Sequence, residues 1–337
     1  MTSEPDRAEA VGHAPVLLEQ VVAALAPAPG ETVLDATVGR GGHALELARR
    51  IRPGGTLIAI DRDRGNLEFA GARLAAVFDI LPPAVETEIG SPDLGPPLRL
   101  VHGDFGAMDE ITTSRRARVD CMLADLGVAS VHFDDPERGF SFRFDGPLDM
   151  RLDRSRGATA AALIDSLSES ELAEAIRLLG EEPFAARIAR KIAQARESAP
   201  ISTTSKLAEL VREAYGPRAR RSRMHPATRT FMALRIAVND ELGSLARLLA
   251  AISAAAEAIA TGTASWLAPG ARVAIVSFHS LEDRAVKHAF ASLADRGLAT
   301  ASRRPIEATA EEVAANPRSR SAKLRIATVG VPASTRS

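Results

Sequence analysis

The sequence predicts an α/β protein in which an all-helical domain is inserted into a largely parallel sheet. Short apolar runs alternate with amphipathic helical segments from residue 15 to about residue 126, a rhythm typical of parallel strands joined by right-handed crossovers. From about residue 159 to residue 235 only helical patterns occur. Strand-like runs return at 271–278 and 323–329, so two separated parts of the chain are expected to build one sheet.

The elements of the first half follow from apolar patterns and the residues that break them. Residues 15–25 predict a helix that Pro27 and Pro29 end. Residues 80–97 carry five prolines and predict a loop or an insertion. Buried-strand patterns occur four times, and helical patterns separate the first three of them: strands at 32–37, 56–63, 98–105 and 119–126, helices at 43–51 and 66–78.

The domain boundaries follow from the change of rhythm. Residues 1–10 are expected to form a disordered tail. Residues 11–145 and 236–337 are expected to form the discontinuous sheet domain, and residues 146–235 a helical insertion that serves substrate recognition.

Composition indicates a soluble cytoplasmic protein. The 337 residues carry a net charge of -1, and the single cysteine, Cys121, excludes a disulfide framework and a CxxC metal site. The first residues lack the apolar core of a secretory signal. Residues 246–260 are rich in alanine but hold Arg247 and Glu257, so they predict an amphipathic helix too short to cross a bilayer. No membrane association is expected.

Positive charge is concentrated in two segments. Residues 216–236 contain six arginines and no acid, and residues 316–325 contain three arginines, one lysine and no acid. Local basic patches on a neutral protein favour a polyanionic partner held at one face. The alternative is a solvated arginine-rich surface.

The stretch LDATVGRGGH joins a strand to a helix through Gly39, Gly41 and Gly42. Such a turn lets the backbone approach a ligand at a helix N-terminus. Gly39, Gly41 and Ala44 also fit the dinucleotide pattern G-x-G-x-x-A, and Asp61 lies 20 residues after Gly41. A tight bend without a ligand is the alternative.

Asp35, at the end of the strand before this turn, changes the expected ligand. Its carboxylate would repel a pyrophosphate by about 1–4 kcal/mol at surface-like dielectric constants, and it would attract a cation. S-adenosylmethionine carries a sulfonium, an ammonium and no phosphate, so it is the predicted cofactor. Asp61 ends the second strand and is predicted to accept hydrogen bonds from the ribose. The alternative for Asp61 is a surface salt bridge with Arg62 or Arg64.

Several blocks of the sequence resemble one family, the RsmH (MraW) family of ribosomal RNA small subunit methyltransferases H. The resemblance runs from about His13 to Val329 and rests on HAPVLLEQVV, LDATVGRGGHALE, IAIDRD, DLGVASVHFDDPERGFSFRFDGPLDMRLD, GEEPFAARIAR, HPATRTFMALRIAVNDEL, SFHSLEDR and NPRSRSAKLR. It implies a Rossmann-like domain with a helical insertion, an S-adenosylmethionine-dependent enzyme, and methylation of N4 of a cytidine in the decoding region of 16S rRNA. The implied partner is 16S rRNA in the small ribosomal subunit, with no stable protein partner.

The resemblance also implies cofactor contacts, residue by residue. They fall on the turn and on three later strand ends: Gly41, Gly42, His43, Asp61, Phe105, Asp125 and His132. The segment DLGVASVHFDD departs from the usual family pattern DLGVSS-x-QLD. Ala129 replaces a serine, His132 a glutamine and Phe133 a leucine, and Met232 replaces a common glutamine. At one edge a histidine ring offers a single donor or acceptor, whereas the amide of glutamine offers both, so the implied contact at His132 is less secure.

Asp125 is the candidate catalytic residue. Methyl transfer from a sulfonium is an in-line displacement that depends on alignment. The cytosine amine is a poor nucleophile, and an acceptor for its protons helps to pyramidalise the nitrogen and then takes a proton. Asp125 ends the fourth strand, at the sheet edge where ligands gather. Holding the cofactor is a competing and compatible role.

The remaining candidates concern RNA. In SFHSLEDR, Ser280 and Asp283 predict a capping box, while His279 and Arg284 are predicted to contact the target base or its phosphate. The alternative is that Ser280 caps and His279 packs. No metal is expected, since the seven histidines show no ligand spacing. The predicted RNA-phosphate contacts in the basic segments are Arg229, Arg235, Arg318, Arg320, Lys323 and Arg325.

Three other functional hypotheses also fit the sequence. An NAD-dependent dehydrogenase would use the same glycine turn, and a non-catalytic RNA-binding protein would use the basic segments. A methyltransferase for DNA or a small molecule fits the chemistry as well. Phe140, Phe142 and Phe144 alternate along the chain, so they could stack on a base that has left its stack or form plain core.

Overall fold

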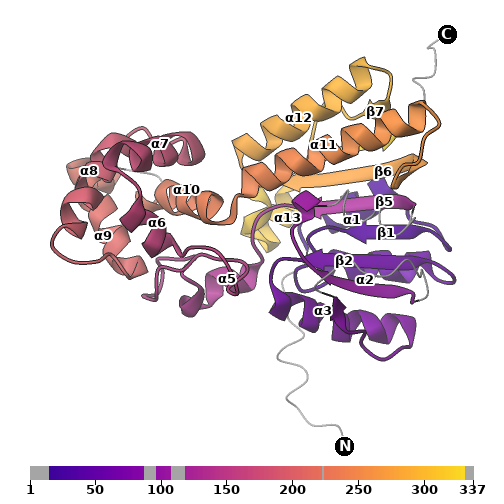
Figure 1. Ribbon diagram of the computed structural model, residues 1–337, viewed down its shortest axis with the longest axis horizontal. Helices are drawn as coiled ribbons and strands as arrows, with labels where there is room; N and C mark the ends of the chain where they lie inside the picture. The colour runs from indigo at the N-terminus through magenta and orange to yellow at the C-terminus, as the bar shows by residue number, and fades with distance from the viewer. Residues whose placement is uncertain (1–14, 87–95, 108–117, 222–223, 331–337) are drawn as a thin grey trace, which may run out of the picture. The chain divides into compact units, whose positions relative to one another are not determined.

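The computed structural model describes residues 15–86, 96–107, 118–221 and 224–330. The predicted tail, 1–10, and half of the proline-rich segment 80–97 therefore lie outside the described residues. The chain divides into two compact units, one made of residues 1–127 and 243–337 and the other of residues 128–242. Figure 1 shows the elements of both.

The first unit contains one mixed sheet. Its strands run in the order β3-β4-β2-β1-β5-β6-β9-β7, and β8 pairs with β9. Neighbours from β3 to β6 pair in parallel, whereas β9 is antiparallel to β6, β7 and β8. The strands are β1 (Thr32–Asp35), β2 (Thr56–Asp61), β3 (Val85–Glu86), β4 (Leu98–His102), β5 (Val119–Asp125), β6 (Leu267–Ser277), β7 (Ala299–Ala301), β8 (Ile306–Glu307) and β9 (Lys323–Val329).

All six predicted strands are confirmed. The three additional strands have two or three residues each, too few for a period-2 pattern to be read. One of them, β3, lies in the proline-rich segment, so the prediction of a loop throughout that segment is wrong at Val85 and Glu86.

Strand order reverses at β1, which pairs with β2 on one side and β5 on the other. Ligands of open α/β sheets bind outside the carboxyl ends of the strands at such a switch point. The turn after β1 and the end of β5 therefore meet where a ligand is expected.

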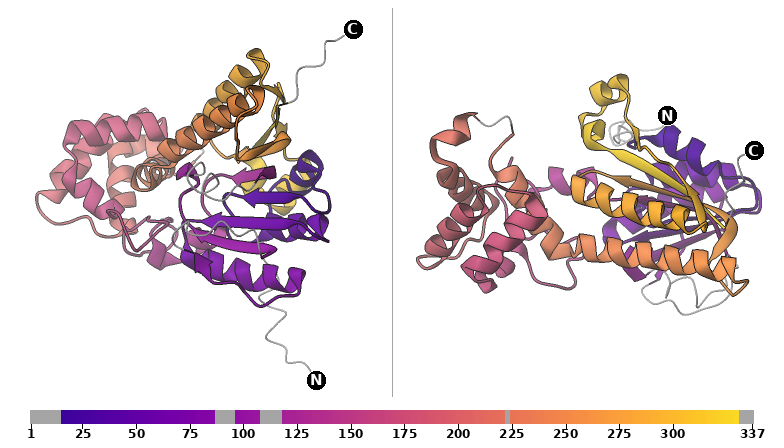
Figure 2. Two further views of the ribbon diagram at one scale, coloured as in Figure 1. Left: turned by 45° about the vertical axis from the view of Figure 1, so that its right-hand side comes forward. Right: turned by 90° about the horizontal axis from the view of Figure 1, so that it is seen from above.

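Helices cover both faces of this sheet (Figures 1 and 2). Successive strand residues point to opposite faces, so Val33 packs with one layer of helices and Leu34 with the other. The first layer is α1 (Leu18–Leu25), α2 (Gly42–Ile51) and α3 (Arg64–Phe78); the second is α11 (Glu241–Ala260) and α12 (Ser280–Asp295). Two faces of buried apolar residues explain why these strands read as continuous apolar runs.

Helix α11 is longer than the sequence pattern suggested. At 20 residues it is long and apolar enough to cross a membrane by length and composition. Its side chains Leu245, Leu248 and Ile252 instead pack in the core against the sheet. A buried core helix passes the same test, so this one is weak evidence for a membrane span.

The second unit is helical and has its own core. Its elements are α5 (Ser130–Asp134), η3 (Pro136–Arg138), α6 (Ala160–Ser166), α7 (Glu169–Gly180), α8 (Ala185–Arg196), α9 (Thr204–Tyr215), η4 (Gly216–Arg221) and α10 (Ala227–Asn239). Side-chain caps begin several helices: Thr159 caps α6, Thr203 caps α9, and Ser168 forms a capping box with Glu171 at α7.

This unit extends beyond the boundaries 146 and 235 that the sequence suggested. Phe140 is buried in its apolar core, together with residues of α6 to α10. At the other end, the Asn239 side chain accepts from Leu152 N at 2.8 Å and donates to Met150 O at 2.8 Å. Tertiary packing therefore assigns residues 128–145 and 236–242 to the helical unit.

Candidate active site

The glycine turn between β1 and α2 has the conformation that its residues require. Gly39 and Gly41 have φ values of 51° and 80°, which side chains with a Cβ rarely adopt. A Cβ on Gly41 would also lie 3.3 Å from the Ala70 Cβ, and one on Gly42 would lie 2.6 Å from the Pro15 side chain. The turn brings its backbone close to neighbouring elements as well as to the carboxyl ends of the strands.

Asp35 ends β1 in the interior of the first unit, where it is 1% exposed. One carboxylate oxygen accepts from Thr37 N at 3.1 Å. Burial raises the pKa of Asp35 to about 7, because desolvation disfavours the charged form, and the charge of Asp61 adds to the effect. The hydrogen bond from Thr37 opposes the shift. A cation beside this group would restore the carboxylate.

Asp61 ends β2 and is bound to the glycine turn. Its two oxygens accept from Gly39 N at 2.8 Å and from Asp63 N at 2.7 Å. A carboxylate has further lone pairs, so Asp61 can fix the turn and still accept from a ligand. Of the arginines named as alternative partners, Arg62 pairs with Asp104, and Arg64 pairs with Glu68 at 2.9 Å.

Asp125, at the end of β5, lies next to His43 of α2. Asp125 Oδ2 is 3.6 Å from His43 Nδ1, and Asp125 N donates to Thr37 Oγ1 at 2.7 Å. Desolvation raises the pKa of Asp125 well above its usual value, and the charges of Asp35 and Glu282 act in the same direction. Among the described residues, Asp125 Oδ1 is buried without a hydrogen-bond partner.

Glu282 is a member of this group that the sequence analysis missed. It is 2% exposed, at the start of α12, and accepts from Phe278 N at 2.9 Å and His279 N at 3.3 Å. The capping box of α12 is formed by His279 and Glu282, so the predicted box of Ser280 and Asp283 is wrong by one residue. An imidazole nitrogen accepts from N3 as a hydroxyl would, which the usual cap preferences do not anticipate.

A second missed residue, Asp104, organises the loop after β4. It accepts from Ser244 Oγ at 2.8 Å and from Gly106 N at 2.9 Å, and it pairs with Arg62. Burial would raise its pKa, but Arg62 and these hydrogen bonds outweigh that effect and lower it. Phe105 follows and packs against the core. Asp104 lies two residues after the end of β4, close to the strand-end position that identified Asp35, Asp61 and Asp125.

His132, the remaining predicted cofactor contact, belongs to the helical unit. It lies on α5, is 3% exposed, and its ring centroid is 5.3 Å from that of Phe140.

The three alternating phenylalanines have different environments. Phe140 lies in the core of the helical unit, Phe142 packs against that core, and Phe144 is exposed.

Three of the predicted RNA contacts are paired with carboxylates within the protein. Arg235 makes two hydrogen bonds of 2.8 Å to Glu241, and Arg325, 4% exposed, donates to Asp283 Oδ1 at 2.7 Å. Lys323 shares Asp283 at 3.3 Å. The Arg325 guanidinium is buried and the Arg235 side chain is 14% exposed, and a carboxylate occupies each, so neither is proposed as a phosphate contact. Lys323, with 39% of its side chain exposed, stays a predicted RNA contact.

The other predicted RNA contacts lie nearer the surface. Arg284 on α12 and Arg320 on η5 (Pro317–Ser321) are exposed, while Arg318 and Arg229 are half-buried. His279 is different, because its ring caps α12 and its Nε2 lies 3.1 Å from Glu282 Oε1. These contacts within the protein favour the packing alternative for His279.

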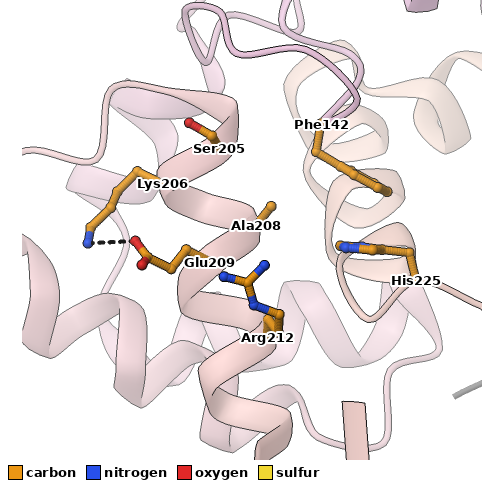
Figure 3. Close-up of a pocket in the computed structure, with 7 residues that line it drawn as sticks. All are labelled: Phe142, Ser205, Lys206, Ala208, Glu209, Arg212 and His225. Carbon is orange, nitrogen blue, oxygen red and sulfur yellow. Dashed lines mark hydrogen bonds and ion pairs between the residues drawn. The ribbon is translucent and has the colours of Figure 1, made fainter. Parts of the chain in front are cut away.

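The helical unit contains a pocket of about 380 Å³. Figure 3 shows Phe142 and His225 on one side of it and Lys206 and Glu209 on the other. The two rings are stacked, with centroids 4.3 Å apart and planes inclined by 24°. The pocket is lined by Phe142, Ser205, Lys206, Ala208, Glu209, Arg212 and His225. Aromatic and cationic side chains together are suited to a nucleotide.

The chemistry of the strand ends in the first unit follows from their charge. Asp35 and Asp125 have raised pKa values, the charge of Glu282 adds to the shift of Asp125, and Asp61 binds the adjacent turn. This arrangement disfavours a pyrophosphate and favours a cation. It also offers a basic oxygen, on Asp125, for proton transfer.

Comparison with known proteins assigns the chain to a described group. The family model described as the MraW methylase family matches residues 10–329. A protein of Symbiobacterium thermophilum named "Ribosomal RNA small subunit methyltransferase H" is 43% identical over 330 residues, covering 93% of this chain and 95% of that protein. Proteins of the same name from Syntrophotalea carbinolica and Acidothermus cellulolyticus are each 42% identical, covering 94% and 97% of this chain and 98% and 97% of their own lengths.

Proposed function

The chain belongs to the MraW methylase family, and we propose that it methylates N4 of a cytidine in the decoding region of 16S rRNA. S-adenosylmethionine supplies the electrophilic methyl group. The relatives' name, which specifies the small subunit RNA, supports the substrate. We further propose that the assembled small subunit is the substrate and that the enzyme acts in the bacterial cytoplasm.

The observation that carries this proposal is the group of carboxylates at the strand ends around the glycine turn, of which Asp35 is buried and the Asp125 side chain is 25% exposed. Asp35 and Asp125 both have raised pKa values, and Asp125 Oδ1 has no hydrogen-bond partner among the described residues. A sulfonium or ammonium beside them stabilises their charged forms. A nicotinamide dinucleotide would instead bring its pyrophosphate to the same acids, so the site disfavours the hypothesis of an NAD-dependent dehydrogenase.

The chain's residues divide the work at this site. Gly39, Gly41 and Gly42 let the backbone approach the adenosyl group, and Asp61 accepts from its ribose. Asp125 accepts a proton of the cytosine amine, so that the nitrogen lone pair can attack the methyl carbon. Phe105 and His132 complete the proposed cofactor contacts that the family resemblance implies.

We propose that the helical unit recognises the RNA. The stacked rings of Phe142 and His225, with Arg212 beside them, support base and phosphate contacts there. Arg229 in the same unit, and Arg284, Arg318 and Arg320 in the first unit, are proposed phosphate contacts. Most of this binding should be electrostatic and salt-dependent.

The test is incubation with S-adenosylmethionine labelled in its methyl group and small subunits that lack the modification. We expect label in 16S rRNA, at N4 of one cytidine after digestion to nucleosides. Label in DNA, in protein or in no macromolecule would contradict the proposal. Asp125→Asn should lower the single-turnover rate at saturating cofactor by at least about a hundredfold, the usual contribution of a positioned base.

A further inference from the structure

The tautomer of His43 is fixed by the fold. Its Nε2 lies 2.9 Å from the carbonyl oxygen of Val16, which can only accept a hydrogen bond. Nε2 therefore carries the proton, and His43 is buried with 6% of its surface exposed. The other ring nitrogen, Nδ1, is then unprotonated, and it lies 3.6 Å from Asp125 Oδ2.

A histidinium–carboxylate ion pair is the competing interpretation of this contact. It would require a proton on both ring nitrogens in a site where desolvation lowers the pKa of His43 to about 4. The remaining charged groups that face Asp125 are Asp35 from β1 and Glu282 from α12, and both oppose a second negative charge nearby. A neutral imidazole beside a strongly basic carboxylate agrees with each of these contacts.

We propose that His43 is a positioning residue that makes Asp125 a stronger base, because its unprotonated Nδ1 faces the carboxylate. The inference rests on the proposed function and adds a role to the cofactor contact expected of His43. An imidazole lone pair repels a carboxylate oxygen and accepts a hydrogen bond from a carboxylic acid. The state of Asp125 that has taken a proton is therefore favoured.

The proton balance of the step is simple. The C–N bond to the transferred methyl forms as the C–S bond breaks, and the electron pair of that bond stays on sulfur. The methylated nitrogen then carries a positive charge, and one N–H bond breaks with its electrons returning to nitrogen. The proton passes to Asp125, whose Oδ2 lies 3.6 Å from the unprotonated His43 Nδ1, while His43 Nε2–H stays hydrogen-bonded to the carbonyl oxygen of Val16.

The test is His43→Gln, which keeps an amide donor for Val16 but lacks the acceptor at Nδ1. Single-turnover methylation of small subunits is measured against pH at saturating S-adenosylmethionine. We expect the acid limb of the rate profile to move down by about one pH unit and the plateau to fall about three- to tenfold, as for a weakened base. An acid limb that stays in place or moves up would overturn the inference.

Calorimetry separates this role from cofactor binding. We expect the dissociation constant of S-adenosylmethionine to rise by no more than about tenfold in His43→Gln, the loss of one contact, while the shift of the acid limb persists at saturating cofactor. A loss of affinity that accounts for the whole rate effect would overturn the inference. Absence of methyl transfer by the unaltered enzyme would instead contradict the proposed function.

A measurement on the unaltered protein decides the question if the variant does not fold. Nitrogen-15 chemical shifts of labelled histidine distinguish the two neutral tautomers and the imidazolium. At pH 7 we expect His43 to be neutral with its proton on Nε2. A proton on Nδ1, or a charged ring, would overturn the inference.

Discussion

Asp35 shows how a single buried acid ties cofactor binding to pH. Its pKa is about 7 in the folded chain and 3.8 in the unfolded reference, so the folded state binds the proton more tightly. Between these values the stability of the cofactor-free protein falls as pH rises. A bound cation favours the carboxylate, so cofactor binding releases protons and tightens toward higher pH.

The variant Asp35→Asn should remove this coupling while keeping an acceptor for Thr37 N. We expect weaker S-adenosylmethionine binding and about one proton fewer released on binding near pH 6. Calorimetry in two buffers with different ionisation enthalpies measures the released protons. Affinity of the unaltered protein that does not change between about pH 5.5 and pH 8 would contradict the assignment of Asp35 to the cation, given its folded-state pKa.

Asp61 and Asp63 form a matched pair for testing the ribose contact. Asp61→Ala removes one or two charge-assisted hydrogen bonds of about 1.5–3 kcal/mol each, so cofactor affinity should fall at least about tenfold. Asp63 caps α3 through Gly65 N at 2.9 Å, and Asp63→Ala should cost about 1 kcal/mol of stability. Cofactor affinity should stay unchanged in that control. Equal affinity losses in both variants would remove Asp61 from the ribose site.

At the scale of elements, the turn between β1 and α2 combines backbone conformation with packing. Gly41→Ala forces a φ of 80° on a residue with a Cβ and adds a 3.3 Å contact with Ala70. Gly262→Ala imposes a similar φ, 72°, with no atom within 4 Å. Both should lower stability by about 1–2 kcal/mol. Only Gly41→Ala should also weaken cofactor binding, which calorimetry and thermal denaturation measure together.

The neighbouring elements η5 and β9 carry arginines with different tasks. Arg325→Met leaves the half-buried Asp283 with Lys323 alone and should cost about 3 kcal/mol of unfolding free energy. Arg320→Met should leave stability unchanged and reduce the slope of log affinity against log salt for rRNA by about 0.7–0.9. Denaturant melts and filter binding at several salt concentrations test this. An unchanged salt slope for Arg320→Met would exclude it from the RNA contacts.

At the scale of the whole molecule, we expect the pocket of the helical unit to contribute to RNA binding, in addition to the proposed phosphate contacts of the first unit. Arg212→Ala combined with His225→Ala alters the pocket of the helical unit and should lower affinity for small subunits at least about tenfold, given about 1–3 kcal/mol per stacked base. Affinity for S-adenosylmethionine should stay the same. Arg177→Ala is a control in the same unit, because its side chain is 63% exposed and pairs only at 4.0 Å with Glu174. An equal loss in the control would contradict a pocket-specific role.

Much of the fold could be predicted from the sequence because its signals are local. Buried strands such as Thr56–Asp61 and capped helices such as α7 carry their patterns within a few residues. The end of the helical unit could not be predicted in this way. It depends on Asn239 bonding to Met150 and Leu152, nearly ninety positions away along the chain.

The same difference between local signals and long-range contacts applies to the candidate site. Asp35, Asp61 and Asp125 could be identified because an acid directly after a buried strand lies at the ligand edge of a parallel sheet. Glu282 could not, since it comes near only through the packing of α12. The partners of Arg235 and Arg325 could not be identified either, because a basic segment gives no sign of which guanidinium a carboxylate binds, whether it is 6 residues away, as Glu241 is, or 42, as Asp283 is.

The sequence by itself determined the order of strands and helices, the glycine turn, the acids that end the strands and the family. Tertiary structure alone decided which acids share one buried site, which tautomer His43 adopts and which arginines reach solvent. The reason is that propensities, caps and turns act over a few residues, whereas charge state and exposure depend on every group that folding brings within a few ångströms.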